Sequence, residues 1–383
     1  MKFIVDRDIL LSALSVVEKF VPSKSPITLL SGIRFIASPD YLSLSATDLD
    51  MGIEHKIPVV DTSDDSIKIL ETGSKVFPAR IFSEIARKMP MGEVMFSCSD
   101  GRVEINAGNF SMTLPYFESE DFPEITRDEL SPAMNFSQKL FKNMIKQTIF
   151  ARAEESTSRP QLTGILVECR QNTLNMVALD GFRIAWRKEN LEKDSSVVNA
   201  DFSLIIPGRT LMEVSRIFGD GEESFTLYAG KNRMEFRTES TVISSRLLEG
   251  NFIDYEQVTR VEPKTIVDID VDSLFSAIDR GLTLAREGSK NNLIRFRISD
   301  GLVEVSAETE MGSLCDRMQC QKEGDDLLIA FNARFLMDAL RSIETPDVHL
   351  TFSGESGPCI MRPKGAQNHV NFVLPVKIRG EDY

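Results

Sequence analysis

A short helical pattern that occurs three times, about 125 residues apart, is the feature of this chain that most constrains its fold. In each copy an Arg is followed four residues later by an acid and seven residues later by a second Arg; the copies are Arg80-Glu84-Arg87, Arg209-Glu213-Arg216 and Arg334-Asp338-Arg341. Apolar or small residues, beginning with Ile81 and Phe82 in the first copy, form the opposite stripe at about 100° per residue. The pattern predicts one module, repeated three times, that buries one helix face and presents a mildly cationic face to a common object.

A second repeated element precedes each of these helices. Residues 42–46, 174–178 and 303–307 alternate between apolar and other residues, end on Ala, and follow the turn formers Asp40, Asn172 and Asp300, as strands of hairpins do. Each repeat also opens with an amphipathic helix, for which Asp6 and Ser137 are candidate N-caps. The sequence therefore predicts an α+β fold of three modules, each of two helices and about eight strands, over residues 1–128, 132–259 and 263–383.

Catalytic and metal-binding motifs are missing from the sequence. The five Cys residues form no CxxC pair, the three His residues lie far apart, and no nucleophile, phosphate-loop or dinucleotide motif occurs. The strongest remaining acid–base candidates are Asp48 and Asp180, which occupy equivalent places in two modules, so a hydrolase using them stays open as an alternative to a turn role. We expect no enzyme activity, no metal and no cofactor.

The opening residues predict where the protein resides. The apolar start Met1–Val5 meets Asp6 too early for a signal sequence, and no apolar run approaches the roughly 20 residues of a membrane span. We therefore expect a cytoplasmic protein without a membrane partner.

Charge is distributed unevenly along the chain. The six expected helices together carry +7, and residues 137–153 alone carry +4, whereas the whole chain carries −14. The strands and loops consequently carry −21. Positive helices in an acidic protein indicate a face that holds a polyanion through its backbone while other faces repel it. Solvated helix faces with i,i+4 ion pairs are the open alternative.

Five segments in order resemble the bacterial sliding clamps, the beta subunits of DNA polymerase III. They are the opening MKFIVDRDILLSAL, LSATDLDMGI at Leu44–Ile53, FPARIFSEIARKMP at Phe77–Pro90, VALDGFRIA at Val177–Ala185 and FVLPV at Phe372–Val376. The resemblance covers the chain from Met1 to about Ile378. It implies a non-enzymatic processivity factor: a head-to-tail homodimeric ring of six modules, with helices that line a hole for duplex DNA and continuous sheets outside.

The resemblance also implies site residues. Those expected to face DNA are basic: Lys24, Arg80, Arg87, Lys88, Lys139, Lys142, Lys146, Arg152, Arg209, Arg216, Arg280, Arg334 and Arg341. The dimer interface is expected to join Phe110 and Met112 to Thr283 and Leu284. A hydrophobic pocket for short peptide motifs is expected from Leu162, Leu179, Gly181, Phe182, Arg183, Ile184, Ile253, Val258, Phe372, Leu374, Pro375, Val376 and Lys377.

The partners implied by the resemblance are double-stranded DNA without sequence preference, a second copy of the chain, the replicative polymerase's catalytic subunit, an ATP-dependent clamp loader, and other polymerases and repair proteins. It also implies association with the nucleoid. The chain departs from the family pattern at Phe182, Ile253 and Thr283 and in a tail, Arg379–Tyr383, past the usual end. A repeat-built scaffold that binds proteins but never DNA is the other open function.

Overall fold

The structure is a computed structural model that describes residues 1–59, 67–124, 129–191, 201–258, 261–288 and 292–377; the tail Arg379–Tyr383 lies outside these residues. Contacts divide the chain into two compact units. Within the described residues, the first comprises Met1–Lys139 and Arg216–Leu247, and the second comprises Leu140–Ser195, Asp201–Ser215 and Leu248–Tyr383. Each unit is described by itself below.

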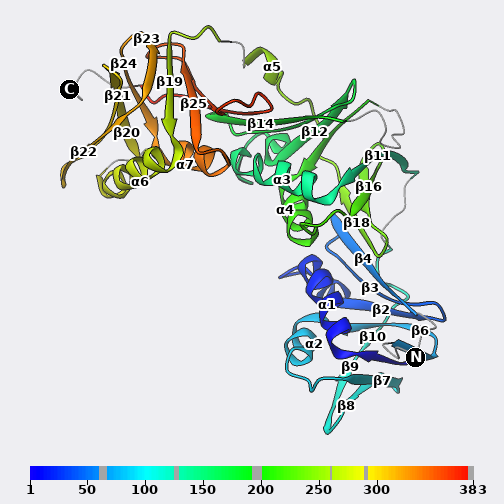
Figure 1. Ribbon diagram of the computed structural model, residues 1–383. Helices are drawn as coiled ribbons and strands as arrows, with labels where there is room; N and C mark the ends of the chain where they lie inside the picture. The colour runs from blue at the N-terminus through cyan, green and yellow to red at the C-terminus, as the bar shows by residue number, and fades with distance from the viewer. Residues whose placement is uncertain (60–66, 125–128, 192–200, 259–260, 289–291, 378–383) are drawn as a thin grey trace. The chain divides into compact units, whose positions relative to one another are not determined.

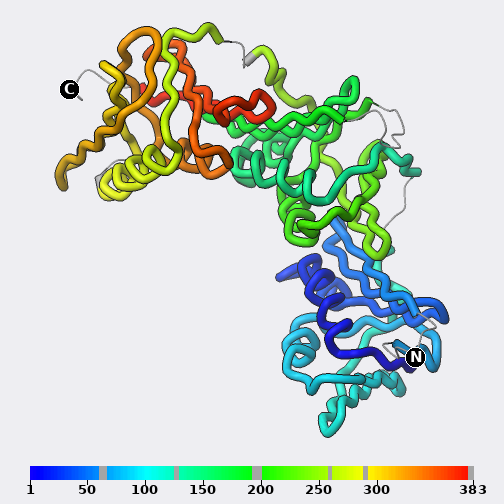
Figure 2. The backbone as a smooth tube through the Cα atoms, in the orientation of Figure 1, coloured from blue at the N-terminus to red at the C-terminus, as the bar shows by residue number. Residues whose placement is uncertain are grey.

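The helices fall where the repeats predict them. The described residues contain α1 (Arg7–Val17), α2 (Ala79–Ala86), α3 (Gln138–Lys146), α4 (Gly208–Ile217), α5 (Tyr255–Val258), α6 (Val271–Gly288) and α7 (Ala333–Arg341). The predicted cap of α1 is confirmed, because Asp6 Oδ1 accepts hydrogen bonds from the backbone N–H groups of Asp8 (2.8 Å) and Ile9 (3.4 Å). Figure 2 shows α1 and α2 side by side, and Figure 1 shows the same for α6 and α7. The two helices expected in each repeat are thus confirmed, whereas the one-turn helix α5 was not predicted.

The first unit contains two antiparallel sheets. One has the strand order β5-β1-β7-β8-β9, spanning Ile67–Glu71, Lys2–Asp6, Glu93–Ser99, Arg102–Ala107 and Phe110–Pro115. The other has the order β10-β6-β2-β3-β4-β18-β17-β16-β11, spanning Phe117–Glu118, Gly73–Pro78, Gly32–Ser38, Tyr41–Thr47, Met51–Pro58, Thr241–Arg246, Arg233–Arg237, Ser224–Ala229 and Ser131–Ser137. The β4–β18 pair makes one sheet from strands of the first and second expected modules.

The second unit repeats this plan. Its nine-stranded sheet has the order β15-β12-β13-β14-β27-β26-β25-β19-β23, spanning Phe202–Pro207, Gly164–Arg170, Thr173–Leu179, Arg183–Asn190, His369–Val373, Cys359–Pro363, Asp347–Phe352, Thr265–Asp270 and Gln321–Gly324. Its four-stranded sheet has the order β22-β21-β20-β24, spanning Gly312–Gln319, Leu302–Thr309, Leu293–Ser299 and Leu327–Asn332. The β14–β27 pair joins strands of the second and third expected modules, so the expected continuous sheets are present in each unit.

The predicted hairpins are confirmed as strands β3, β13 and β21. Two of their entry turns use positive φ: Gln171 and Asn172 have φ values of 49° and 61°, and Asp300 and Gly301 have values of 48° and 72°. Consecutive positive φ angles give the turn whose twist matches the flanking strands, which explains Asn172, Asp300 and Gly301 at three of these four places. The apolar residues of each strand then pack into the core, as Leu44, Leu174 and Val305 do with no exposed surface.

The predicted helix stripes are correct with two exceptions. Ile81, expected in the buried stripe, is 47% exposed, because it sits at the margin of the face that α2 buries through Phe82 and Ala86. Glu213, expected on the solvent face of α4, is only 8% exposed. Arg-acid-Arg spacing therefore does not keep the acid in solvent in every copy. None of the helices in the described part of the chain is long and apolar enough to cross a membrane.

Candidate functional site

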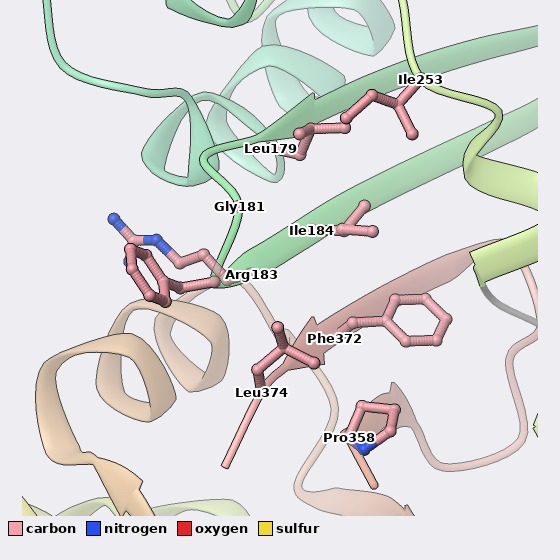
Figure 3. Close-up of a pocket in the computed structure, with 9 residues that line it drawn as sticks. Leu179, Gly181, Arg183, Ile184, Ile253, Pro358, Phe372 and Leu374 are labelled. Carbon is pink, nitrogen blue, oxygen red and sulfur yellow. The ribbon is translucent and has the colours of Figure 1, made fainter. Parts of the chain in front are cut away.

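A pocket of about 160 Å³ lies within the second unit. Leu179 ends β13, Gly181 and Phe182 form the turn that follows, and Arg183 and Ile184 begin β14. The other lining residues are Ile253 before α5, Pro358 before β26, Phe372 in β27 and Leu374 after it. Figure 3 shows Leu179 and Ile253 at one end, Pro358 and Leu374 at the other, and Ile184 and Phe372 between them. Apart from the Arg183 side chain, the lining is apolar.

The pairing of β14 with β27 brings the pocket residues together from distant parts of the sequence. Ile184 lies opposite Phe372, and the backbone N–H of Leu374 donates to the carbonyl of Phe182 over 2.9 Å. Opposite residues on one face of an antiparallel pair have adjacent side chains, so Ile184 and Phe372 form a continuous apolar floor. Phe372 is 3% exposed and packs with Ile360 and Val370.

Large apolar side chains around this floor remain open to solvent. Phe182 is 61% exposed, Leu374 is 44% exposed and Ile253 is 37% exposed. Phe182 stacks on Phe335 of α7, with ring centroids 6.2 Å apart. An apolar floor with exposed apolar residues at its margin is the arrangement of a site for an apolar ligand group.

Arg183 is held rigidly at the side of the pocket. Its Nε donates to Asp180 Oδ2 over 3.0 Å and its Nη1 donates to Asp338 Oδ2 of α7 over 2.7 Å. Its guanidinium also lies over the rings of Phe335 and Phe150, 4.5 Å and 5.6 Å from their centroids. These contacts explain why the Arg183 side chain is only 12% exposed, and they fix the wall formed by its aliphatic stem.

The two candidate catalytic aspartates are turn residues. Asp180 Oδ1 accepts from the N–H groups of Phe182 (2.9 Å) and Arg183 (3.1 Å), and Gly181 between them has a φ of 96°. Asp48 Oδ1 accepts in the same way from the N–H groups of Asp50 (3.1 Å) and Met51 (2.8 Å). Each carboxylate stabilises its own hairpin. The hydrolase interpretation of this pair therefore has no support in the geometry.

The structure gathers eight of the thirteen residues predicted for the pocket: Leu179, Gly181, Phe182, Arg183, Ile184, Ile253, Phe372 and Leu374. Leu162 packs beneath it against Leu179 and Ala153 and is 3% exposed. Pro375, Val376 and Lys377 follow β27 without lining it, and the side chain of Val258 lies outside the described residues. Sequence reasoning missed Pro358, because it lies in a loop between β25 and β26 that carries no motif.

Most of the basic residues predicted to face DNA lie at the surface. The exposed ones are Lys24, Arg80, Arg87, Lys88, Lys139, Lys146, Arg209, Arg216, Arg280, Arg334 and Arg341, whereas Lys142 and Arg152 are half-buried. Acids from other elements engage some of the exposed guanidiniums. Arg87 forms an ion pair with Glu18, and Arg280 Nε donates to Asp316 Oδ2 of β22 over 2.6 Å.

The residues predicted for the dimer interface occupy two kinds of element. Phe110 and Met112 are half-buried in β9, an edge strand of the five-stranded sheet. Thr283 and Leu284 lie in α6; Thr283 is exposed and its Oγ1 donates to the carbonyl of Asp279 over 3.0 Å, while Leu284 packs against the core. The polar Thr283 hydroxyl is thereby satisfied within its own helix.

Comparison with known proteins identifies the same family along nearly the whole chain. Family models of the DNA polymerase III beta subunit match it over residues 1–126 (N-terminal domain), 135–254 (central domain) and 257–377 (C-terminal domain). The beta sliding clamp of Staphylococcus aureus is 33% identical over 383 residues, covering 98% of this chain and 99% of that protein. The beta sliding clamp of Halalkalibacterium halodurans is 31% identical over 381 residues, covering 98% of this chain and all of that protein.

The fold agrees with these relatives. A crystal structure of the DNA polymerase sliding clamp from Bacillus subtilis superimposes with a TM-score of 0.94 at 30% identity, and the match covers 99% of this chain and 100% of that one. This chain therefore belongs to the family of the DNA polymerase III beta subunit, the beta sliding clamp, which is a processivity factor and not a catalytic subunit.

Proposed function

We propose that two copies of this chain close head to tail into a ring around duplex DNA, and that each copy tethers the replicative polymerase through the pocket beside Phe372. The observation that carries the tethering proposal is the apolar pocket floor with Phe182, Ile253 and Leu374 exposed at its margin. Such a site accepts a short extended peptide that inserts apolar anchors, and it suits several partners that share such a motif.

The proposed ring rests on three modules, residues 1–128, 132–259 and 263–383, and on two free sheet edges. Strand β9, with Phe110 and Met112, is an edge in the first unit, and β22 is an edge in the second. An edge strand offers unpaired backbone groups that another chain satisfies by pairing. Pairing β9 of one copy with β22 of the other, beside Thr283 and Leu284 of α6, would close the ring and remove both edges.

The tethering proposal is tested by peptide binding. Overlapping peptides that cover the cognate polymerase's catalytic subunit are screened, and the tightest is labelled for fluorescence anisotropy. Leu374→Ala should weaken it about tenfold, because burying a leucine side chain contributes about 1.5–3 kcal/mol. Leu70→Ala is the matched control, since Leu70 is 52% exposed on β5, in the other unit. Equal affinity for wild type and Leu374→Ala would refute this pocket as the tether.

We further propose that the basic helix faces meet the DNA backbone. Lys139 is exposed in the first turn of α3, and Lys146 is exposed at the last residue of the same helix. Contacts to phosphate carry no sequence information, so they suit a ring that moves along any duplex. The ring itself, rather than affinity, would prevent escape.

Retention on DNA tests the ring and these faces together. The protein is loaded onto nicked circular plasmid by the cognate ATP-dependent loader, washed in salt high enough to abolish phosphate binding, and measured before and after one restriction cut. Retention on the circle and release from linear DNA would support encirclement; equal loss from both would favour a scaffold that never encircles DNA. Lys139→Glu with Lys146→Glu should reduce loading. Lys231→Glu with Lys264→Glu, two exposed lysines outside helices, is the charge-matched control.

The remaining partners follow from this proposal. A closed ring needs an energy-driven loader, and other polymerases and repair proteins would compete for the same pocket by short apolar motifs. We place the protein in the cytoplasm on nucleoid DNA. Co-purification of the loader with wild type but not with a Leu374→Asp variant would show that loader and polymerase share the site.

A further inference from the structure

One wall of the pocket comes from the segment that leads into α5, where Ile253 lies. The other lining residues come from β13, β14 and the turn between them, from the loop before β26, and from β27 with the residue after it. Figures 1 and 2 show α5 on the side of β14 away from α3. A one-turn helix is too short to be stable alone, so its position depends on what anchors it to the sheet.

Tyr255, two residues after Ile253, provides that anchor. Its side chain is 4% exposed, and its hydroxyl donates to the carboxylate of Glu168 in β12. Its ring meets Trp186 of β14 edge to face, with centroids 5.1 Å apart. The start of α5 is otherwise capped locally, because Asp254 Oδ1 accepts from the N–H of Gln257 over 3.3 Å.

Glu168 is an unusual partner for this position. It has no exposed surface and lies on β12 between Val167 and Cys169, which are also buried. Its other oxygen is 2.9 Å from Nη2 of Arg170, whose side chain is 62% exposed. A buried carboxylate needs hydrogen bonds to offset its lost hydration, so the Tyr255 hydroxyl is strongly held. Burial and the bond to Glu168 also raise the pKa of Tyr255, so the hydroxyl stays protonated and able to donate into alkaline pH.

We propose that Tyr255 is a positioning residue for the pocket: the bond from its hydroxyl to buried Glu168 fixes α5 on the sheet and so holds Ile253 at the pocket wall. The strength of that bond then sets how tightly an apolar peptide anchor is enclosed. This inference rests on the proposed tethering function of the same pocket. It concerns a residue that touches no ligand and acts through Ile253.

The first test is Tyr255→Phe, which removes the hydroxyl and keeps the ring against Trp186. Glu168 then keeps its ion pair with Arg170, although its second oxygen accepts no hydrogen bond within the described residues, so the melting temperature is measured to show that the variant is folded. The labelled polymerase peptide should bind about fivefold more weakly, because a bond to a charged group is lost and part of that loss reaches Ile253. Hydrogen exchange of amides 253–257 should quicken in the free protein. Tyr116→Phe, whose hydroxyl accepts from the N–H of Gly101 in the first unit, is the matched control and should change neither.

A double-mutant cycle separates positioning from general loosening. In an Ile253→Ala background, Tyr255→Phe should cost less than about twofold, because the side chain that it positions is gone. In a Leu374→Ala background the fivefold loss should persist, since Leu374 lies on a different segment. The Glu168→Gln variant keeps an oxygen to accept the hydroxyl and should retain most of the affinity.

The outcomes are distinct. Equal loss in both backgrounds, or wild-type affinity for Tyr255→Phe while Ile253→Ala and Leu374→Ala bind weakly, would overturn the positioning role alone. If Ile253→Ala and Leu374→Ala both bind as tightly as wild type, the peptide lies elsewhere and the proposed tether fails together with this inference. Trp186 is the chain's one tryptophan, so its emission reports independently whether the Tyr255 ring has moved.

Discussion

His369 should make the second unit sensitive to mild acid. It lies in β27 opposite Arg187 of β14, is 2% exposed, and has Nε2 3.2 Å from Ser342 Oγ and 3.3 Å from Asn371 Nδ2. Burial, reinforced by the positive charge of Arg187, lowers the pKa of His369 to about 4; a backbone hydrogen bond at Gln147 acts in the opposite direction. Glu189 pairs with Arg187 over 2.7 Å and moderates that charge.

The sign and size of the effect follow from linkage. An unfolded histidine titrates near a pKa of about 6.5. Between about pH 6.5 and pH 4, His369 is therefore protonated in the unfolded chain but neutral in the folded chain. The contribution of His369 to the free energy of unfolding is complete above about pH 6.5 and is lost as the pH falls toward 4. The full loss is about 3 kcal/mol, of which about 2 kcal/mol falls between roughly pH 7.5 and pH 5.

Urea unfolding followed by Trp186 fluorescence measures this, because Trp186 lies opposite Val370 in the same strand pair. The variant His369→Gln should be less stable than wild type at about pH 7.5. From about pH 7.5 to about pH 5, however, the free energy of unfolding of the variant should fall by about 2 kcal/mol less than that of wild type. The control Val348→Ala weakens β25 of the same sheet without removing a titratable group, since Val348 has no exposed surface, and it should keep the wild-type slope. Parallel pH dependence of wild type and His369→Gln would refute the assignment.

Three further changes test other parts of the chain. Asp6→Ala should lower the free energy of unfolding by about 1 kcal/mol in urea titrations, because it removes the cap of α1; Asp8→Ala, which leaves the cap, should cost less, and equal costs would contradict the capping role. Gly324→Ala should lower the melting temperature far more than Gly101→Ala, although both glycines have positive φ. An added Cβ at Gly324 would lie 2.0 Å from the Lys264 carbonyl oxygen, whereas a Cβ at Gly101 would meet no atom within 4 Å. Similar melting temperatures for the two variants would contradict this explanation. Maleimide should label exposed Cys315 faster than buried Cys359, and labelling of Cys315 on β22 should slow as protein concentration favours the proposed dimer; unchanged rates would exclude β22 from the interface.

The sequence predicted what depends on local pattern. The hairpin strands β3, β13 and β21 follow from alternation after turn residues, and α1 follows from its periodicity and its Asp6 cap. The pocket residues were expected through resemblance of short motifs, and the pairing of β14 with β27 is what brings them to one place. Register between strands nearly 190 residues apart leaves no mark in either segment alone.

What the sequence could not predict depends on contacts between distant residues. The helix α5 has four residues, too few to show a period. Glu168, which accepts the hydrogen bond from Tyr255 of α5, lies 87 residues before that tyrosine in the sequence. Nothing in the local pattern of β12 distinguishes Glu168 from a solvent-facing carboxylate. Pro358 likewise lines the pocket only because β26 pairs with β27.

The repeated acid of the three Arg-acid-Arg helices shows how equal sequence positions acquire different roles. Glu84 remains exposed and pairs with Arg80 over 3.6 Å, Glu213 is buried in α4, and Asp338 turns toward Arg183 at the pocket. Glu213 and Asp338 are thus less exposed than Glu84, although Asp338 also pairs with Arg341 of its own helix over 3.5 Å.

Acids of other elements also engage helix cations, because Glu18 pairs with Arg87 and Asp316 pairs with Arg280. The charge presented by a helix therefore depends on which acids its neighbours supply. Asp338 also links two sites. It lies on α7, the helix that carries Arg334 and Arg341, and it forms an ion pair with Arg183 at the pocket wall. In the third repeat, the helix proposed to meet DNA and the pocket proposed to hold the polymerase share one carboxylate.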